Sequence, residues 1–198
     1  MLRSIYPIVE GHGEVKAVPV LLRRFAYEVH DNQEFYPFPP HRIPRGQIMA
    51  ANQLEKAVEL GARKVHQRGG GAILVLIDAD SDCPAEIGPS ILERVRKARP
   101  DVAASVVVAK AEYEAWFLAS ARSLRGKRNI SSNAEPPSEP EKIRAAKEYV
   151  SQVLMVPGTT YSPTVDQSAL TAVFDFAQAR QCPSFDKLWR DLDRLFGL

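Results

Sequence analysis

Three aspartates alternate with small residues directly after the most apolar stretch of the chain. Asp78, Asp80 and Asp82 follow the run 71–77, which contains no polar side chain. Carboxylates clustered at the end of a buried segment are costly unless a cation compensates them, and an all-oxygen ligand set favours Mg²⁺ or Mn²⁺ over zinc. Such ions lower the pKa of a bound water, polarise a phosphoryl oxygen and, when two bind ~4 Å apart, clamp the attacking and leaving oxygens. The spacing therefore indicates metal-dependent phosphoryl chemistry.

Polar residues also follow two other apolar segments. Glu10 comes directly after the segment 5–9, and Lys110 comes directly after the segment 102–109. If these segments are neighbouring strands, Glu10 joins the aspartates as a fourth carboxylate on one edge. Lys110 is placed to neutralise charge that develops on a phosphate. A second metal site would be completed by Glu112 or Glu114.

Each candidate also has a purely structural interpretation. Asp78 and Asp80 can belong to a solvated loop between a strand and a helix, and Asp82 can cap the helix that begins near Pro84. Glu10 can pair with Arg3 or Lys16, and Lys110 can be an ordinary lysine at a strand end. Glu112 or Glu114 can cap the helix that follows them.

The elements that must position these residues alternate between strand and helix patterns. The runs at 5–9, 71–77 and 102–109 lack polar alternation, which is typical of strands covered on both faces. Helices are expected between them, and this order predicts an α/β, Rossmann-like parallel sheet flanked by helices. In such sheets ligands bind at the carboxyl ends of the strands. Pro7 argues against a central position for the first strand, because proline donates no ladder hydrogen bond. The expected helices lie over 18–29, 47–66, 87–95 and 115–118.

The last third of the chain differs in composition. Residues 125–142 are rich in Ser, Asn, Pro and charged side chains, which predicts a loop. Apolar residues at helical spacing then predict three helices, over 143–154, 170–177 and 185–195. We expect an α/β domain over 1–124 and a C-terminal helical extension over 125–198, packed on or beside it as one structural unit.

The composition narrows the functional classes. Lys and Arg number 26 against 24 Asp and Glu, so the net charge of +2 falls short of a dedicated nucleic-acid-binding domain. Cys83 and Cys182 lack metal-ligand spacing, which favours reduced thiols. The chain shows no signal-peptide pattern and no apolar run near the ~20 residues of a membrane span. We therefore expect a cytoplasmic protein with no membrane partner.

A family resemblance rests on these same motifs. Ile8-Val9-Glu10-Gly11, taken with Asp78-Ala-Asp80-Ser-Asp82, resembles the signature of Toprim domains, the metal-binding module of topoisomerases, primases and overcoming-lysogeny-defect nucleases. That likeness covers roughly residues 3–120. The segments 9–14, 78–84 and 112–119 resemble more closely a group of uncharacterised bacterial Toprim-like proteins, often encoded beside an ABC or AAA ATPase.

The resemblance implies roles for individual residues. Glu10 corresponds to the Toprim glutamate, a metal ligand or general acid/base, and Asp78 with Asp80 corresponds to the metal-binding pair. Glu14 matches the second acid of a Glu-Gly-x-x-Glu nuclease pattern. Cys83 departs from the family, because many Toprim proteins have glycine there, and its side chain restricts phosphate approach. Three later residues resemble a recurring patch of the family to which no chemistry is assigned: Tyr161, Asp166 and Gln167.

These observations predict a Mg²⁺- or Mn²⁺-dependent nuclease subunit that acts on DNA or RNA phosphodiesters, and the family resemblance implies an ABC or AAA ATPase as a candidate partner. Topoisomerase and primase activities are not expected, because no tyrosine-nucleophile or zinc-binding domain accompanies the motifs. One alternative is a non-catalytic Toprim-fold module that binds an ATPase or nucleic acid. Another is a phosphatase of the haloacid-dehalogenase type with Asp78 as nucleophile, although that fold usually has its Asp-x-Asp on the first strand.

Overall fold

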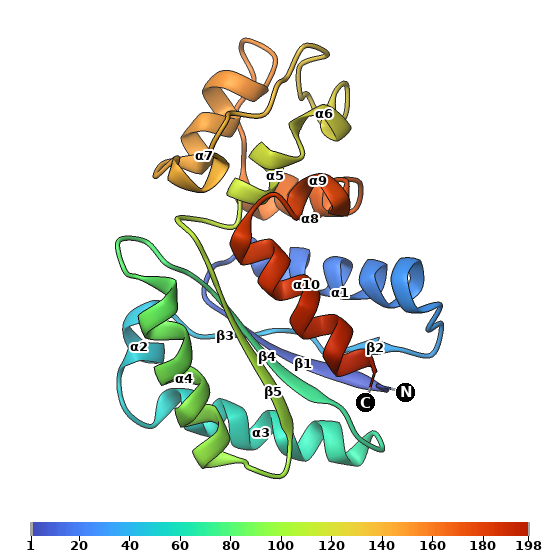
Figure 1. The fold of residues 1–198 in the computed structure, drawn as a ribbon, viewed down its shortest axis with the longest axis vertical. Helices are drawn as coiled ribbons and strands as arrows, with labels where there is room; N and C mark the ends of the chain where they lie inside the picture. The colour runs from blue at the N-terminus through green and yellow to red at the C-terminus, as the bar shows by residue number, and fades with distance from the viewer. Residues whose placement is uncertain (1, 198) are drawn as a thin grey trace.

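A five-stranded parallel sheet forms the centre of the molecule. The computed structural model describes residues 2–197. The long strands lie in the order β1, β4, β5, and two short strands pair with the free edge of β1. The α/β fold with a parallel sheet flanked by helices is thus confirmed (Figure 1). The strands are β1 (Ser4–Val9), β2 (Tyr36–Pro37), β3 (His41–Arg42), β4 (Ala72–Asp78) and β5 (Ala103–Ala109).

The position of β1 differs from the expectation based on Pro7, since β1 has paired strands on both sides. The carbonyls of Arg3, Ile5 and Val9 accept bonds from the β2 and β3 side. The backbone polar groups of every second residue point to the same side of a strand, so the backbone nitrogen of Pro7 also faces β2 and β3. There it faces the gap between β2 and β3, where no ladder hydrogen bond from Pro7 is required. A central proline is tolerated because its neighbour is split into two short strands.

Four helices cover the two faces of the sheet. Alternate residues of each strand point to opposite faces, so both faces are apolar, as the unbroken hydrophobic runs predicted. On one face Leu74 and Val107 pack in a core with α1 and α10; on the other Val75 and Val106 pack with α3 and α4. The helices are α1 (Glu14–His30), α3 (Gln53–Gln67), α4 (Pro84–Ala98) and α10 (Pro183–Phe196).

Short helices gather beyond the carboxyl ends of the strands (Figure 1). Trp116 and Phe117 are fully buried there, consistent with a packing role for these aromatics. The single helix expected over 47–66 is divided, and Asn52 between its parts has a left-handed φ of 74°. The short elements are α2 (Arg45–Met49), α5 (Ala115–Ala119), α6 (Ala121–Leu124), η1 (Pro140–Lys142), α7 (Ala146–Tyr149), η2 (Val150–Leu154), η3 (Pro163–Gln167), α8 (Ser168–Thr171) and α9 (Phe176–Ala179); η1 is a 3-10 helix, and η2 and η3 are π-helices.

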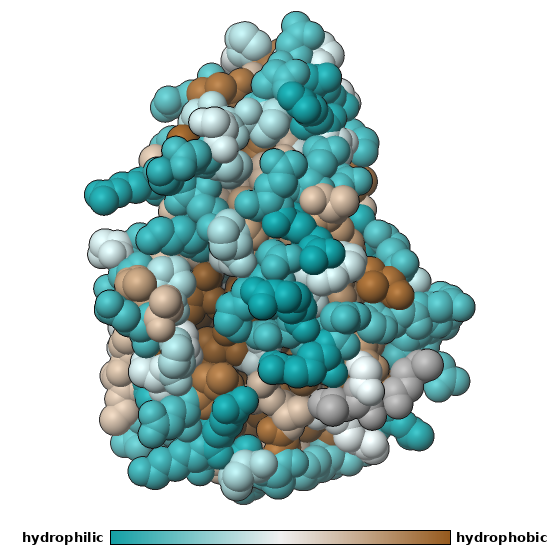
Figure 2. Space-filling model, viewed as in Figure 1, coloured by the Kyte–Doolittle hydropathy of each residue, from teal (hydrophilic) through white to brown (hydrophobic). Residues whose placement is uncertain are grey.

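A groove of about 700 Å³ runs between α4 and α10 over the edge strand β5. Its apolar lining shows as a brown area between more polar helices in Figure 2. Lys110 and Cys83 lie at the end of the groove that is nearest to the carboxyl ends of the strands. Within residues 2–197, no helix has the length and apolar character needed to cross a membrane.

Candidate functional site

The turns that follow β4 and β5 are bonded to each other at the carboxyl edge of the sheet. The backbone N–H of Ala79 donates to the carbonyl of Ala109 at 2.8 Å, and that of Asp80 donates to the carbonyl of Ala111 at 3.3 Å. Asp80 and Ala111 both adopt left-handed backbone conformations, with φ of 50° and 61°. Such conformations are unfavourable for these residue types and occur preferentially at functional sites. Two strained turns therefore meet where the carboxylates gather.

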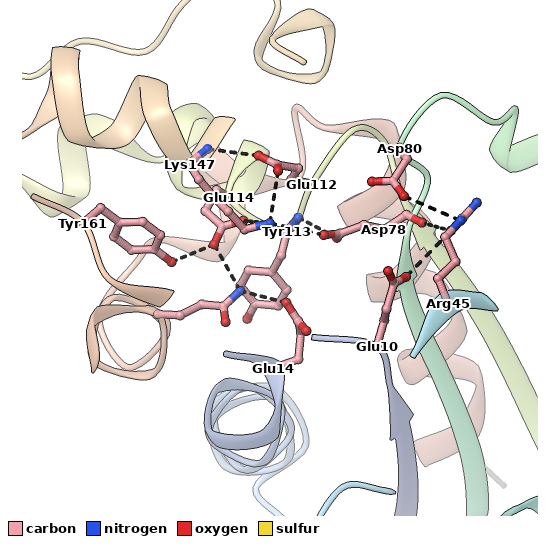
Figure 3. Close-up of polar contacts among 11 residues, drawn as sticks. Glu10, Glu14, Arg45, Asp78, Asp80, Glu112, Tyr113, Glu114, Lys147 and Tyr161 are labelled. Carbon is pink, nitrogen blue, oxygen red and sulfur yellow. Dashed lines mark hydrogen bonds and ion pairs between the residues drawn. The ribbon is translucent and has the colours of Figure 1, made fainter. Parts of the chain in front are cut away.

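One group of carboxylates surrounds a partly buried arginine from α2, and we call it the Arg45 cluster: Arg45, Glu10, Asp80 and Asp82. The guanidinium lies 3.7 Å from Glu10 Oε2 and 3.6 Å from Asp80 Oδ2, and it donates directly to the Asp82 carboxylate. It also donates to the backbone carbonyls of Asp78, the last residue of β4, and of Ala79. Arg45 thus ties the acidic loop to α2 (Figure 3).

A second group surrounds a lysine from α7, and we call it the Lys147 cluster: Lys147, Asp78, Glu112 and Glu114. The ammonium Nζ lies 3.1 Å from Glu112 Oε1, 3.6 Å from Asp78 Oδ2 and 3.7 Å from Glu114 Oε2. Glu112 also accepts a bond from the backbone N–H of Lys147. The backbone N–H of Tyr113 donates to Asp78 Oδ1 at 2.9 Å, which fixes that carboxylate (Figure 3).

Side chains from the C-terminal segment close the inner wall of the site. The hydroxyl of Tyr161 donates to Glu114 Oε1 at 2.8 Å. The amide nitrogen of Gln167 donates to Glu14 Oε1 at 3.1 Å and to Glu114 Oε1 at 3.4 Å. Gln167 lies in the π-helix η3, a conformation that is frequent at functional sites. These bonds connect Glu14 on α1 to Glu114 before α5.

Two glycines leave space for these inner side chains. A Cβ on Gly13 would lie 1.8 Å from Gln167 Oε1, and a Cβ on Gly11 would lie 2.2 Å from Glu14 Oε2. A methyl group at either position would force the side-chain end of Gln167 or Glu14 to move. The glycines after β1 thus leave room for these two side chains in the positions they occupy.

Burial raises the pKa of the inner carboxyl groups. The pKa of Glu114 is raised to about 7 by loss of hydration, opposed in part by Lys147. Burial and then the nearby Glu14 charge raise the pKa of Asp78 well above its ordinary value, and burial also raises the pKa of Glu10. Burial alone would lower the pKa of Lys147, but the surrounding carboxylates raise it above its ordinary value. The site thus carries more negative charge than its two cations compensate.

The oxygen atoms of the site fit a hard divalent cation in their chemistry. Four buried side-chain oxygens accept no hydrogen bond among residues 2–197, and an unpaired buried acceptor is costly. In the same part of the chain, no three carboxylate, imidazole or thiolate groups converge closely enough to hold an ion as they stand. Arg45 and Lys147 lie between the carboxylates, so an ion would enter only with movement of side chains. The oxygens without a hydrogen bond belong to Glu10, Glu14, Glu114 and Gln167, and two of them, Glu10 Oε2 and Glu114 Oε2, have only an ion pair at 3.7 Å to Arg45 and Lys147.

The structure brings most of the predicted residues to this edge. The exception is Lys110, whose exposed side chain lines the groove between α4 and α10 instead. Lys147 provides a cation beside the carboxylates. The predicted residues that lie in the two clusters or on the inner wall are Glu10, Glu14, Asp78, Asp80, Asp82 and Glu112, together with Glu114.

Three structural interpretations of these acids are wrong. Glu10 pairs with Arg45, because α2 brings this arginine over the end of β1. The helix after the acidic loop has Cys83 at its N-cap and no side-chain capping bond, so Asp82 is not its cap. Glu114 stands at the N-cap of α5 without a side-chain capping bond, because its carboxylate turns inward to Tyr161.

Sequence reasoning missed both cations of the site. Arg45 lies in a proline-rich segment and Lys147 in the tail, and no spacing to the acidic motifs indicated either residue. Tyr161 and Gln167 were noted only as part of a family patch, and the structure now gives them partners. The third patch residue, Asp166, accepts bonds from the Ser162 backbone N–H and from Arg128.

The comparisons with known proteins give a family but no activity. One family model, described as a domain of unknown function (DUF4276), matches residues 9–193. No curated protein and no solved structure matches the chain.

Proposed function

The chain belongs to the DUF4276 family, and we propose that it is a Mg²⁺- or Mn²⁺-dependent nuclease subunit that hydrolyses nucleic-acid phosphodiesters. The carrying observation is the carboxyl edge of the sheet, where seven carboxylates meet two cations and four buried oxygens accept no bond among the described residues. The resemblance of the Glu-Gly and Asp-x-Asp motifs to Toprim domains supports the same proposal. It also supports a partner ATPase as the regulator.

A divalent ion would be held by oxygens of Glu10, Asp78 and Asp80, with Glu14 and Glu114 as further ligands. When bound, it supplies an activated water and polarises the phosphoryl oxygen. The unfavourable pKa shifts of Asp78 and Glu114 support this assignment, because a nearby cation would restore their charged forms.

The side chains of the protein have roles of their own in this proposal. Lys147 holds the inner carboxylates together, and its ammonium would stabilise negative charge on a phosphate bound beside them. Arg45 holds the backbone of the acidic loop through the carbonyls of Asp78 and Ala79. Tyr161 and Gln167 orient Glu114 and Glu14 from the inner wall.

A non-catalytic module is the second candidate. Arg45 and Lys147 favour this candidate, because they form six ion pairs with the carboxylates of the site without any metal. In this case the edge is a structural network, and the module binds an ATPase or nucleic acid elsewhere. The phosphatase alternative has less support, because Asp78 is largely buried and its raised pKa disfavours a nucleophilic carboxylate.

Nicking of supercoiled plasmid in Mg²⁺ or Mn²⁺ tests the proposal. We expect the wild-type chain to nick, and Asp78→Ala and Asp80→Ala each to lower the rate at least ~100-fold, because metal-supplied charge stabilisation is worth several kcal/mol. Asp101→Ala, at the opposite end of the sheet, is the matched control for loss of one aspartate. Cleavage that survives both site substitutions contradicts the proposal. A wild type that binds no Mn²⁺ in titration calorimetry favours the non-catalytic module.

A further inference from the structure

We propose that Lys110 and Arg144 hold the phosphates on either side of the scissile one, so that the substrate is an internal phosphodiester of a polynucleotide chain. This inference rests on the proposed function and assigns its substrate class. It excludes a terminal phosphomonoester or a mononucleotide as the preferred substrate.

Arg144 lies over the mouth of the site. Its exposed side chain lines a depression of about 240 Å³ together with Asp80, Ser81 and Ala111. Asp80 and Ala111 are the two residues with strained turns at the acidic edge. The segment after η1 therefore contributes twice to this region: Lys147 points into the carboxylates, and Arg144 lies at the entrance.

Lys110 borders the same edge from the groove between α4 and α10. It lines that groove beside Cys83 and Pro84, which end the acidic loop that begins with Asp80. Lys110 also directly precedes Ala111, which lines the depression of Arg144. The two depressions thus adjoin one loop and one turn. Arg144 lines the smaller one, and Lys110 lines the groove at the end nearest the acidic edge, while the groove also contains Lys187, Arg190, Glu141 and Asp191.

Ion pairing distinguishes these two residues from the cations inside the site. The ion pairs of the acidic edge run to Arg45 and Lys147. Within residues 2–197, neither Lys110 nor Arg144 forms an ion pair. Their charges remain available to a polyanion, which needs such compensation to approach seven carboxylates. Arg144 lies beside Asp80 in one depression, and Lys110 lies in the groove on the other side of the turn at Ala111. A chain of phosphates that crosses the acidic edge would meet both cations, whereas a single phosphate would not span from one depression to the other.

The test measures binding of a labelled single-stranded oligonucleotide, kept intact by phosphorothioate linkages, over a series of salt concentrations in Mg²⁺. Each lost phosphate contact should reduce the salt slope by about 0.7 and the affinity at ~0.1 M salt about five-fold. We expect both effects for Lys110→Ala and for Arg144→Ala, and roughly their sum in the double variant. Lys97→Ala, in the last turn of α4 at the far end of the sheet, removes the same charge and should change neither quantity.

A second measurement compares cleavage of the oligonucleotide with hydrolysis of bis(4-nitrophenyl) phosphate, a diester with one phosphate. The double variant should lose at least ten-fold in kcat/KM on the oligonucleotide and keep its rate on the small diester. Equal losses on both substrates, or a salt slope identical to that of the wild type, overturn the inference while leaving the nuclease proposal intact. A wild type that cleaves neither substrate refutes the nuclease proposal, and the inference about substrate class then falls with it.

Discussion

The Arg45 cluster and the Lys147 cluster have the same composition, one cation and three carboxylates, but they differ in burial. In the Arg45 cluster the side chains of Asp80 and Asp82 are 58% and 47% exposed. In the Lys147 cluster Glu114 is fully buried and Asp78 is 17% exposed. Hydration stabilises the exposed carboxylates, whereas the buried ones depend on Lys147 and a few hydrogen bonds.

This difference indicates which half of the site gains most from a divalent ion. Exposed ion pairs contribute little to folding, and their loss is compensated by water. Burial without sufficient partners raises the pKa of a carboxyl group and so favours its neutral form, as it does for Glu114 and Asp78. We therefore expect stability to depend strongly on the Lys147 cluster and weakly on the Arg45 cluster.

The largest expected effect tests this contrast directly. Lys147→Met should lower the free energy of unfolding by about 3 kcal/mol near pH 8 in EDTA, because three carboxylates lose their cation. Arg45→Met should cost about 1 kcal/mol, since two of its partners are solvated. Urea denaturation measures both values. Equal losses in the two variants would show that burial does not distinguish the clusters.

The pH dependence of stability sharpens the contrast. The pKa of Glu114 is about 7 in the folded chain against 4.5 ordinarily, so the folded state binds the proton more tightly. The resulting stabilisation is complete below about pH 4.5 and is lost as the pH rises through about 7. Between about pH 5 and pH 8 the wild type should lose about 2.5 kcal/mol relative to Glu114→Gln, which cannot titrate.

Thermal or urea unfolding at several pH values in EDTA measures this difference. The direction of the change in unfolding free energy is informative, because an ordinary exposed glutamate would cause no loss of stability over this pH range. Addition of Mg²⁺ at about pH 8 should stabilise the wild type more than Glu114→Gln, if the ion uses this carboxylate. Parallel pH profiles for the two proteins would contradict the assigned burial effect.

The smallest expected effect concerns the glycines behind the Lys147 cluster. Gly13→Ala places a methyl group on the amide of Gln167 and should cost about 2 kcal/mol. Gly46→Ala, in the helix that carries Arg45, meets no atom within 4 Å and should stabilise the chain by about 0.5 kcal/mol. Unfolding midpoints that shift in the same direction for both variants would remove this distinction between the two sides of the site.

The sheet and its acidic edge could be predicted because both follow from local patterns. An unbroken apolar run such as 71–77 indicates a strand buried on both faces, and parallel strands align their carboxyl ends. These patterns are sufficient to place Asp78, Asp80 and Glu10 on one edge. Pro7 gave the wrong expectation because its effect depends on the neighbouring strand, which local patterns do not describe.

The cations and the inner wall could not be predicted in the same way. Arg45, Lys147 and Gln167 come from short or irregular elements without a hydrophobic period, so tertiary packing alone decides where they lie. Lys110 shows the converse error. Its position at the end of a strand was predicted correctly, but its side chain lines the groove instead of the cluster.

The division of the strand beside Pro7 into β2 and β3 affects which segment of the molecule unfolds locally most easily. The segment 41–45, which carries β3 and Arg45, pairs with β1 only near Ile8 and Val9, where the Ile43 N–H donates to the Val9 carbonyl. Beyond this short pairing, it is held by side-chain contacts, among them the bonds of Arg45 to the acidic loop. In hydrogen exchange, the amides of 41–43 should therefore exchange earlier than those of β4, which is paired on both sides. Release of this segment would withdraw Arg45 and uncover the acidic loop, while the sheet beneath it stays closed.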